Sequence, residues 1–183
     1  VPSLPELPIQ YADFSIWQRN WIQGEVLENE LVYWKAQLEG IPEQIQLPTD
    51  KARPRELSYQ GGRYSITLSK GIQDKLIAIS EESGTSMFMT MMAAFQVLLY
   101  RITGQDDIVV GTPVAGRQYQ ETENIIGFFI NTLAIRTTFD RVSAATQNFV
   151  GILEQVRNTT LDAYKHQHVY FDQLVDYLDV PRA

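Results

Sequence analysis

Apolar residues at helical spacing alternate with short β-rich runs along the whole chain, and this alternation constrains the fold more than any other feature. Spacings of three and four predict helices over residues 11–24, 29–38, 71–82, 86–102 and 143–164, with a last short helix over 171–178. Alternating or continuous apolar residues predict strands over 63–68, 108–110 and 130–138. Together these patterns indicate a mixed α/β fold.

Each predicted helix carries an apolar stripe that we expect to face the core. In the helix over 86–102, which we expect Ser86 to cap, the stripe consists of Phe88, Met91, Phe95, Leu98 and Ile102. The corresponding stripes of the other helices are Phe14, Trp17 and Trp21; Leu31, Trp34 and Leu38; Ile72, Leu76 and Ile79; Phe149, Ile152, Leu153 and Val156; and Phe171, Leu174, Val175 and Leu178.

Proline and glycine mark the expected irregular segments. Three prolines in residues 1–8 predict an extended linker, and three more predict a loop over residues 41–57. After the apolar run at 108–110, Gly111, Pro113 and Gly116 are expected to break the strand.

Composition and charge exclude several classes of function. The net charge of −7 argues against nucleic acid as a partner, because phosphate binding needs clustered Lys and Arg, and the only basic cluster is Lys51, Arg53 and Arg55. The chain has no cysteine, which excludes disulfides and thiol chemistry and is compatible with the cytoplasm. The most apolar run, residues 87–100, is too short to span a membrane, and no signal peptide is recognisable.

Both histidines lie in one short segment, at positions 166 and 168. They could form a general base with an orienting partner, or two ligands of a metal that still needs a third. The alternative, which we favour, is a polar loop between two helices in which one histidine caps a helix end. No G-x-S-x-G element and no phosphate-binding glycine loop is present.

The apolar run at residues 125–136 is unusual because it contains Asn131. A buried asparagine must find hydrogen-bond partners or cost a few kcal/mol. It therefore either belongs to a satisfied polar network or faces a cavity, and the sequence leaves both alternatives open.

Several segments, spread over the chain in a constant order, carry a family pattern. Residues 11–18, YADFSIWQ, resemble the Y-x-D-F-A-x-W-Q segment of condensation domains of nonribosomal peptide synthetases. Residues 127–136, GFFINTLAIR, resemble their G-F-F-V-N-T-L-x-x-R segment, and residues 166–171, HQHVYF, resemble H-Q-x-Y-P-F with altered spacing at Val169. The segment LPTD at 47–50 followed by Arg53 and Pro54, and GTPVAGR at 111–117, are also typical of the family.

The resemblance implies part of a two-lobed α/β fold similar to chloramphenicol acetyltransferase. Residues 1–10 would be a linker, 11–57 the helical and loop join between lobes, and 58–183 part of the C-terminal lobe. The family's catalytic signature, H-H-x-x-x-D-G, does not occur here, and we expect the chain to be an internal piece that is inactive alone.

The resemblance also implies a reaction and its partners. Donor and acceptor peptidyl carrier protein domains would insert phosphopantetheine arms into a tunnel between the lobes, and an amide would form there. An adenylation domain would adjoin. Asn131 would lie on the tunnel, and Arg136 is predicted to be a structural ion-pair partner and not a substrate contact. The residues expected to be structural motif positions are Asp13, Trp17, Arg117, Gly127, Arg136, His166 and Phe171.

Two other interpretations stay open at this point. The parent could be a related epimerisation, cyclisation or terminal acyltransferase domain, which shares the fold. It could also be a non-catalytic module that only docks carrier proteins. No bound cofactor or metal is expected in any of these cases.

Overall fold

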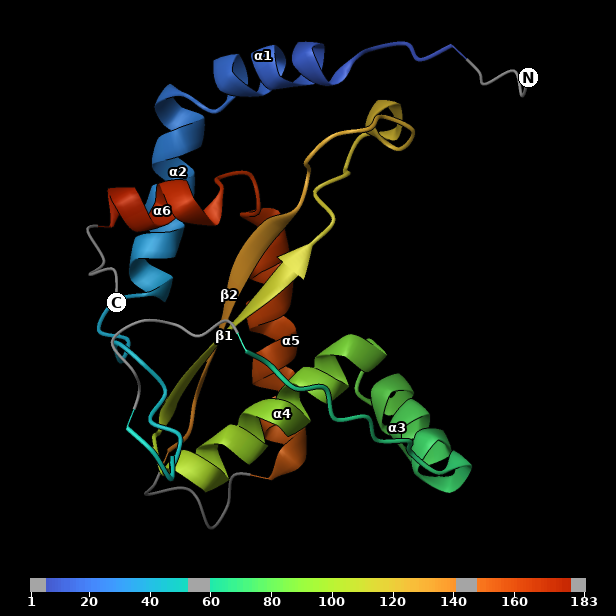
Figure 1. The fold of residues 1–183 in the computed structure, drawn as a ribbon, viewed down its shortest axis with the longest axis vertical. Coiled ribbons are helices and arrows are strands. Elements are labelled where there is room, and N and C mark those ends of the chain that lie inside the picture. Colours follow the sequence, from blue (N-terminus) through green and yellow to red (C-terminus); the bar gives the residue numbers. More distant parts are fainter. Residues whose placement is uncertain (1–5, 53–59, 141–147, 179–183) are drawn as a thin grey trace. The chain divides into compact units, whose positions relative to one another are not determined.

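In the computed structural model, the description covers residues 6–52, 60–140 and 148–178 (Figure 1). The elements in chain order are α1 (Tyr11–Trp21), α2 (Gly24–Gln37), α3 (Lys70–Glu82), α4 (Met87–Thr103), β1 (Asp107–Val114), the short 3₁₀ helix η1 (Gln120–Thr122), β2 (Asn131–Thr138), α5 (Phe149–Lys165) and α6 (Phe171–Tyr177).

The chain forms two compact units that are interleaved in sequence. The first unit consists of Val1–Ile41, Val109–Arg136 and Thr160–Ala183, and the second of Pro42–Ile108 and Thr137–Thr159. Strands β1 and β2 and helix α5 each contribute residues to both units. The predicted linker, join and C-terminal lobe are each one continuous stretch of the chain, unlike these two units. That assignment stays a prediction.

The core of the first unit is aromatic. Phe14 of α1 is buried together with Ile125 and Phe129, and Ile9 and Tyr11 pack against these three. The ring centroids of Phe14 and Phe129 are 4.9 Å apart. Helix α1 begins with a capping box, in which the side chain of Gln10 and that of Asp13 each accept from the other residue's backbone N–H. Helices α2 and α6 also contact each other in this unit.

The second unit is built on the pair α3 and α4. The side chain of Ser86 caps α4 by accepting from the N–H of Met89, as predicted. Between the two helices, the hydroxyl groups of Ser80 and Thr90 lie 2.7 Å apart in a buried hydrogen bond. Helix α5 buries Ile152, Leu153 and Val156 of its predicted stripe.

Strands β1 and β2 hydrogen-bond to each other and form a two-stranded sheet. The N–H of Phe139 donates to the carbonyl of Asp106 at one end, and Gly111 lies against Thr132 farther along, so the strands run antiparallel. The prediction that β1 ends at residue 110 is wrong, since it continues through Gly111 and Pro113. Among the described residues β1 pairs only with β2, and an edge position tolerates a proline without an N–H.

The predicted buried face of α4 is wrong. Phe88, Met91, Phe95, Leu98 and Ile102 are all exposed, and the buried side chains are instead Met89, Thr90, Met92, Ala93, Gln96 and Leu99. The helix is apolar on more than one side, so spacing alone does not select the packed face. The polar members of the buried face are satisfied, because Thr90 bonds to Ser80 and Gln96 accepts from the hydroxyl of Thr137.

Two further expectations differ from the structure. Residues 63–68 form no strand, and Tyr64 and Ile66 are exposed; no described segment pairs with this stretch, and a strand needs a hydrogen-bonded neighbour. Helix α1 ends at Trp21, and α2 begins at Gly24 and not at residue 29.

Some predictions fall outside the described residues, wholly or in part. They concern residues 1–5 of the linker, the motif at Arg53 and Pro54, the basic cluster beyond Lys51, the start of the helix predicted over 143–164, and residues 179–183. Within the described ranges no single helix is long and apolar enough to cross a membrane, although α3 and α4, bent by 106° at their junction, pass that test as a pair.

Candidate functional site

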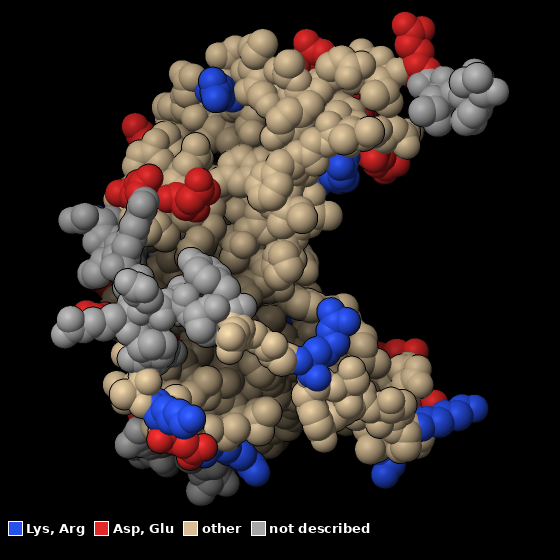
Figure 2. All heavy atoms as spheres, in the orientation of Figure 1, with Lys and Arg blue, Asp and Glu red and all other residues tan. Residues whose placement is uncertain are grey.

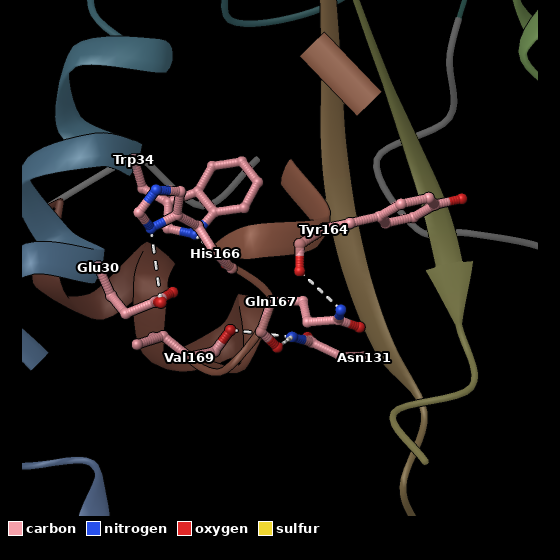
Figure 3. A network of polar contacts seen from close by, with 7 residues as sticks. All are labelled: Glu30, Trp34, Asn131, Tyr164, His166, Gln167 and Val169. Atoms are coloured by element: carbon pink, nitrogen blue, oxygen red, sulfur yellow. Dashed lines mark hydrogen bonds and ion pairs between the residues drawn. The ribbon is translucent and has the colours of Figure 1, made fainter. Parts of the chain in front are cut away.

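The segment at residues 166–171, which we call the 166–171 loop, runs from the end of α5 to the first residue of α6 in the first unit. Its backbone is held by side chains from two distant parts of the chain, and Figure 3 shows these side chains converging on the loop. The predicted loop between two helices is therefore present, and its N–H at position 166 bonds to the carbonyls of Asp162 and Ala163 at the end of α5.

Asn131, the first residue of β2, makes most of these bonds. Its Nδ2 donates to the carbonyls of Gln167 and Val169, both at 2.9 Å, and its Oδ1 accepts from the N–H groups of Thr132 and Phe171. An amide side chain has two donor hydrogens and two acceptor lone pairs, so Asn131 is fully satisfied. It is 5% exposed.

Two residues of α2 hold the other side of the loop. Trp34, which is 1% exposed, donates from its Nε1 to the carbonyl of His166 at 2.8 Å. Glu30 is 5% exposed, and its Oε1 lies 3.5 Å from Nδ1 of His166. Its other oxygen, Oε2, has no hydrogen-bond partner among the described residues.

The electrostatics of this cluster follow from burial. Burial raises the pKa of Glu30 to about 7, although the nearby backbone N–H groups of His168 and Val169 act in the opposite direction. Burial also raises the pKa of Tyr33 to about 12, with smaller contributions from the negative charges of Asp162 and Glu30. A carboxyl group that is half-protonated near neutral pH is uncommon, and such groups gather at functional sites.

The two histidines occupy different surroundings. His166 stacks on Tyr33 with ring centroids 4.0 Å apart, and His168 meets the edge of Trp21 at 4.7 Å. Burial lowers the pKa of both histidines, and His166 lowers that of His168 further. Among the described residues no group of three or more His, Asp or Glu is placed to hold a metal ion.

A small cavity of about 30 Å³ lies beside Asn131, and a space of this size is sufficient for an ordered water. Its lining is both aromatic and polar: Phe14, Trp17, Gln18, Trp21, Gly116, Gln118, Tyr119, Phe129, Asn131, Gln167, His168 and Tyr170. Of the two alternatives for Asn131, the network is present, and the residue also borders a cavity.

The motif residues on α1 and before β2 pack on each other. Trp17 stacks on Trp21, with ring centroids 5.3 Å apart. Gly127 lies so close to the ring of Tyr11 that a Cβ there would overlap it, and the hydroxyl of Tyr11 donates to the carbonyl of Phe128 at 2.8 Å. Asp13 belongs to the capping box of α1.

The two arginines of the motifs bind backbone carbonyls. Arg117 donates from Nη1 to the carbonyls of Thr122 and Glu123, and its guanidinium lies 4.2 Å from the ring centroid of Phe129. Arg136 donates to the carbonyls of Gln37, at 2.9 Å, and Glu39, at 3.0 Å, and so satisfies the C-terminal end of α2.

The sequence interpretation missed Glu30 and Tyr33. Glu30 lies four residues before Trp34 and therefore on the same face of α2, which is the signal that could have identified it. A glutamate on the buried stripe of a helix is rare enough to single out.

Comparison with known proteins places this geometry in a family. The family model described as the condensation domain matches residues 2–183. One of the proteins that make up the linear gramicidin synthase of Brevibacillus parabrevis is 50% identical over 182 residues, covering 100% of this chain and 2% of that protein.

Two solved structures resemble the fold. The X-domain of teicoplanin biosynthesis, solved in a complex with OxyB, has a TM-score of 0.89 and 27% identity, covering 100% of this chain and 40% of that chain. The first condensation domain of the calcium-dependent antibiotic synthetase has a TM-score of 0.75 and 21% identity, covering 96% and 40%.

These matches confirm the predicted α/β fold class, which is part of the chloramphenicol-acetyltransferase-like condensation-domain fold. The chain spans only a small share of the length of its curated relatives. The family match over nearly every residue, the shared fold and the order of the motif segments lead to one conclusion: this chain belongs to the condensation domain family.

Proposed function

We propose that this chain is part of a condensation domain that forms peptide bonds between amino acids held as thioesters on carrier proteins. The observation that carries the proposal is the 50% identity to a linear gramicidin synthase protein over 182 residues. The partners would be a donor and an acceptor peptidyl carrier domain, each presenting a phosphopantetheine arm, within a synthetase that also holds adenylation domains.

The reaction is an acyl transfer. The amine nitrogen of the acceptor attacks the carbonyl carbon of the donor thioester, so that a C–N bond forms and the C–S bond breaks. The nitrogen loses one proton, and the donor arm leaves as a thiol that carries a proton. No external oxidant or reductant is needed.

Asn131 is proposed to act in this reaction as a positioning residue beside the tunnel. Its four hydrogen bonds are all made to backbone groups of this chain, three of them in the 166–171 loop. It would therefore fix the loop wall and leave the contact with the reacting atoms to other groups.

The chain alone is proposed to be inactive. The histidines, His166 and His168, are not arranged as H-H-x-x-x-D-G, and both pack against aromatic rings in the first unit.

The experiment is a transfer assay in the parent protein with both carriers loaded. Intact-protein mass spectrometry should show the donor acyl group on the acceptor carrier, and the 183-residue chain alone should give no transfer. Chiral analysis of the product separates condensation from an epimerising relative, and a heterocyclic product, lighter by one water, would indicate a cyclisation domain.

A second candidate function is a docking module without chemistry. The observation that favours it is the TM-score of 0.89 to the X-domain that was solved in complex with OxyB. If this function were correct, loaded carriers would bind the parent domain, as measured by calorimetry, yet no acyl transfer would follow. The higher sequence identity to a peptide synthase makes amide formation the better-supported function.

A further inference from the structure

An open groove lies on the first unit next to the exposed part of the aromatic cluster. We call it the Trp17 groove; its volume is about 450 Å³, and it is lined by Ile9, Asp13, Phe14, Trp17, Tyr119, Glu121 and Thr122. This volume falls within the range of small-molecule sites. The groove is much larger than the small cavity beside Asn131, and the two share three lining residues, Phe14, Trp17 and Tyr119.

The walls of the groove are aromatic. Trp17 and Tyr119 meet edge to face with ring centroids 5.0 Å apart and planes at 81°, so their faces form two sides of a corner. Phe14 contributes a third ring, 5.7 Å from Trp17. Trp17 is 40% exposed and Tyr119 is 39% exposed, which leaves ring surface available to a ligand.

The charge of the groove has one sign. Of the described residues that line it, only Asp13 and Glu121 are charged, and both are acidic and exposed. The capping box uses one carboxylate oxygen of Asp13, which accepts the N–H of Gln10 at 2.8 Å. In Figure 2, charged side chains of both signs lie at separate points over the part of the molecule where Figure 1 places α1, and most of the surface between them is uncharged.

One basic side chain lies next to the groove. Arg117 is half-buried, and its guanidinium is directed at the ring of Phe129 and at the carbonyls of Thr122, a lining residue, and Glu123. It is not part of the lining of the groove.

From these observations we propose that the Trp17 groove binds an organic cation, specifically an alkylammonium group carried on an aliphatic stem. The ammonium would lie over the faces of Trp17 and Tyr119, where the ring quadrupole attracts a cation. The carboxylates of Asp13 and Glu121 would face it, and the stem would cover the apolar wall. Phosphates and carboxylates would be repelled by the same two acids.

The proposed cation site does not depend on the proposed amide-forming reaction, because its lining residues alone carry the argument. Because the aromatic faces and both acids are exposed, each contributes modestly, and a dissociation constant on the order of 1 mM is expected. The ammonium group has two natural sources, a free amine or a lysine side chain of a polypeptide.

The experiment is an NMR titration of the whole chain at fixed ionic strength, following the indole N–H signal of Trp17. The probes are pentylammonium, pentanol as the neutral analogue of equal length, and pentanoate as the anion. We expect saturable shifts with pentylammonium, at least fivefold weaker binding of pentanol, and no shift with pentanoate. Nα-acetyl-lysine amide is added as a fourth probe, and tighter binding of it or of pentylammonium assigns the source.

Variants locate the cation. Glu121→Gln should weaken pentylammonium binding two- to fivefold, whereas Glu123→Gln, an exposed acid two residues later that does not line the groove, should leave it unchanged. Trp17→Leu should weaken it at least fivefold. Trp17 also packs on Phe14 and Trp21, so the Trp17→Leu protein could be unstable. In that case the Glu121→Gln variant alone tests the proposal.

Three results would overturn the proposal. Equal binding of pentanol and pentylammonium would show an apolar groove without charge selectivity. Equal weakening by the Glu121 and Glu123 changes would show a diffuse attraction to an acidic protein. The absence of any shift of the Trp17 signal at 20 mM pentylammonium, about twenty times the expected constant, would show that there is no site.

Discussion

Glu30 makes the stability of this protein depend on pH, and a single substitution tests that dependence. The carboxyl group is 5% exposed, and burial raises its pKa from 4.5 to about 7. The folded protein therefore retains a proton between pH 4.5 and 7 that the unfolded chain releases. Because the pKa is raised in the folded state, the stabilising contribution of protonated Glu30 is fully present below about pH 4.5. This contribution is lost as the pH rises to about 7.

The size of the effect follows from the shift. One pKa unit corresponds to about 1.4 kcal/mol, so the change from 4.5 to about 7 corresponds to about 3 kcal/mol lost between pH 5 and pH 8. Glu30→Gln replaces the carboxyl by a neutral amide of the same size and removes this titration. The variant should match the native protein near pH 5 and exceed its free energy of unfolding by up to about 3 kcal/mol at pH 8.

The assay is urea denaturation of both proteins at pH 5, 6, 7 and 8 at constant ionic strength. Because Nδ1 of His166 lies 3.5 Å from Oε1 of Glu30, the difference between the two curves reports the carboxyl of Glu30 together with its interaction with His166. Glu28→Gln, at an exposed position of α2, is the matched control for the loss of a glutamate carboxyl from this helix. A Glu30→Gln difference that is equal at pH 5 and pH 8 would show that folding does not raise the pKa of the Glu30 carboxyl.

Three further substitutions test the packing around the loop and the sheet. Asn131→Ala should lower the free energy of unfolding by about 2–4 kcal/mol, because three backbone groups of the 166–171 loop lose their partner, whereas Asn124→Ala, at an exposed position, should cost less than about 0.5 kcal/mol. Gly116→Ala should cost at least about 2 kcal/mol, since φ is +64° and the new Cβ would overlap the carbonyl of Phe129; Gly61→Ala, where a Cβ meets nothing, should stay within about 1 kcal/mol. Arg136→Ala should cost about 1–2 kcal/mol, because two carbonyls at the end of α2 lose a charged donor.

Each of these is measured by urea denaturation and has its own contradicting result. An Asn131→Ala protein as stable as the native one would show that the amide does not hold the loop. Equal costs for the alanines at positions 116 and 61 would mean that the backbone of Gly116 is free to move. No loss for Arg136→Ala would show that water replaces the guanidinium at those carbonyls.

The sequence predicted the elements better than the faces they bury. Helices α3 and α4 were found to within about a residue at each end, because Ser86 caps α4 and Gly84 and Gly104 end the two helices with positive φ. The buried side of α4 was not found, since the helix carries large apolar side chains on its exposed face as well as on its buried one. In such a helix the packed face is decided by neighbours, here the hydroxyl of Ser80.

The candidate site was predictable in part. Asn131 stands out because it is polar within an apolar run, and the sequence therefore identified a residue that needs partners. Three of its four partners are backbone groups 36 to 40 positions away, and no residue pattern encodes a bond to a distant backbone group. The strand predicted over 63–68 failed for a related reason, because alternation indicates the side chains of a strand but not its hydrogen-bonded neighbour.

We propose that the parent of this chain joins carrier-bound amino acids through an amide. A single-turnover measurement tests this in the parent protein, with donor and acceptor carriers loaded and the acceptor weighed by intact-protein mass spectrometry. We expect that the mass of the acceptor rises by the donor acyl group, and that Asn131→Ala slows this step at least tenfold while loading stays normal. An acceptor that never gains the acyl group, with both carriers loaded and bound, would contradict it.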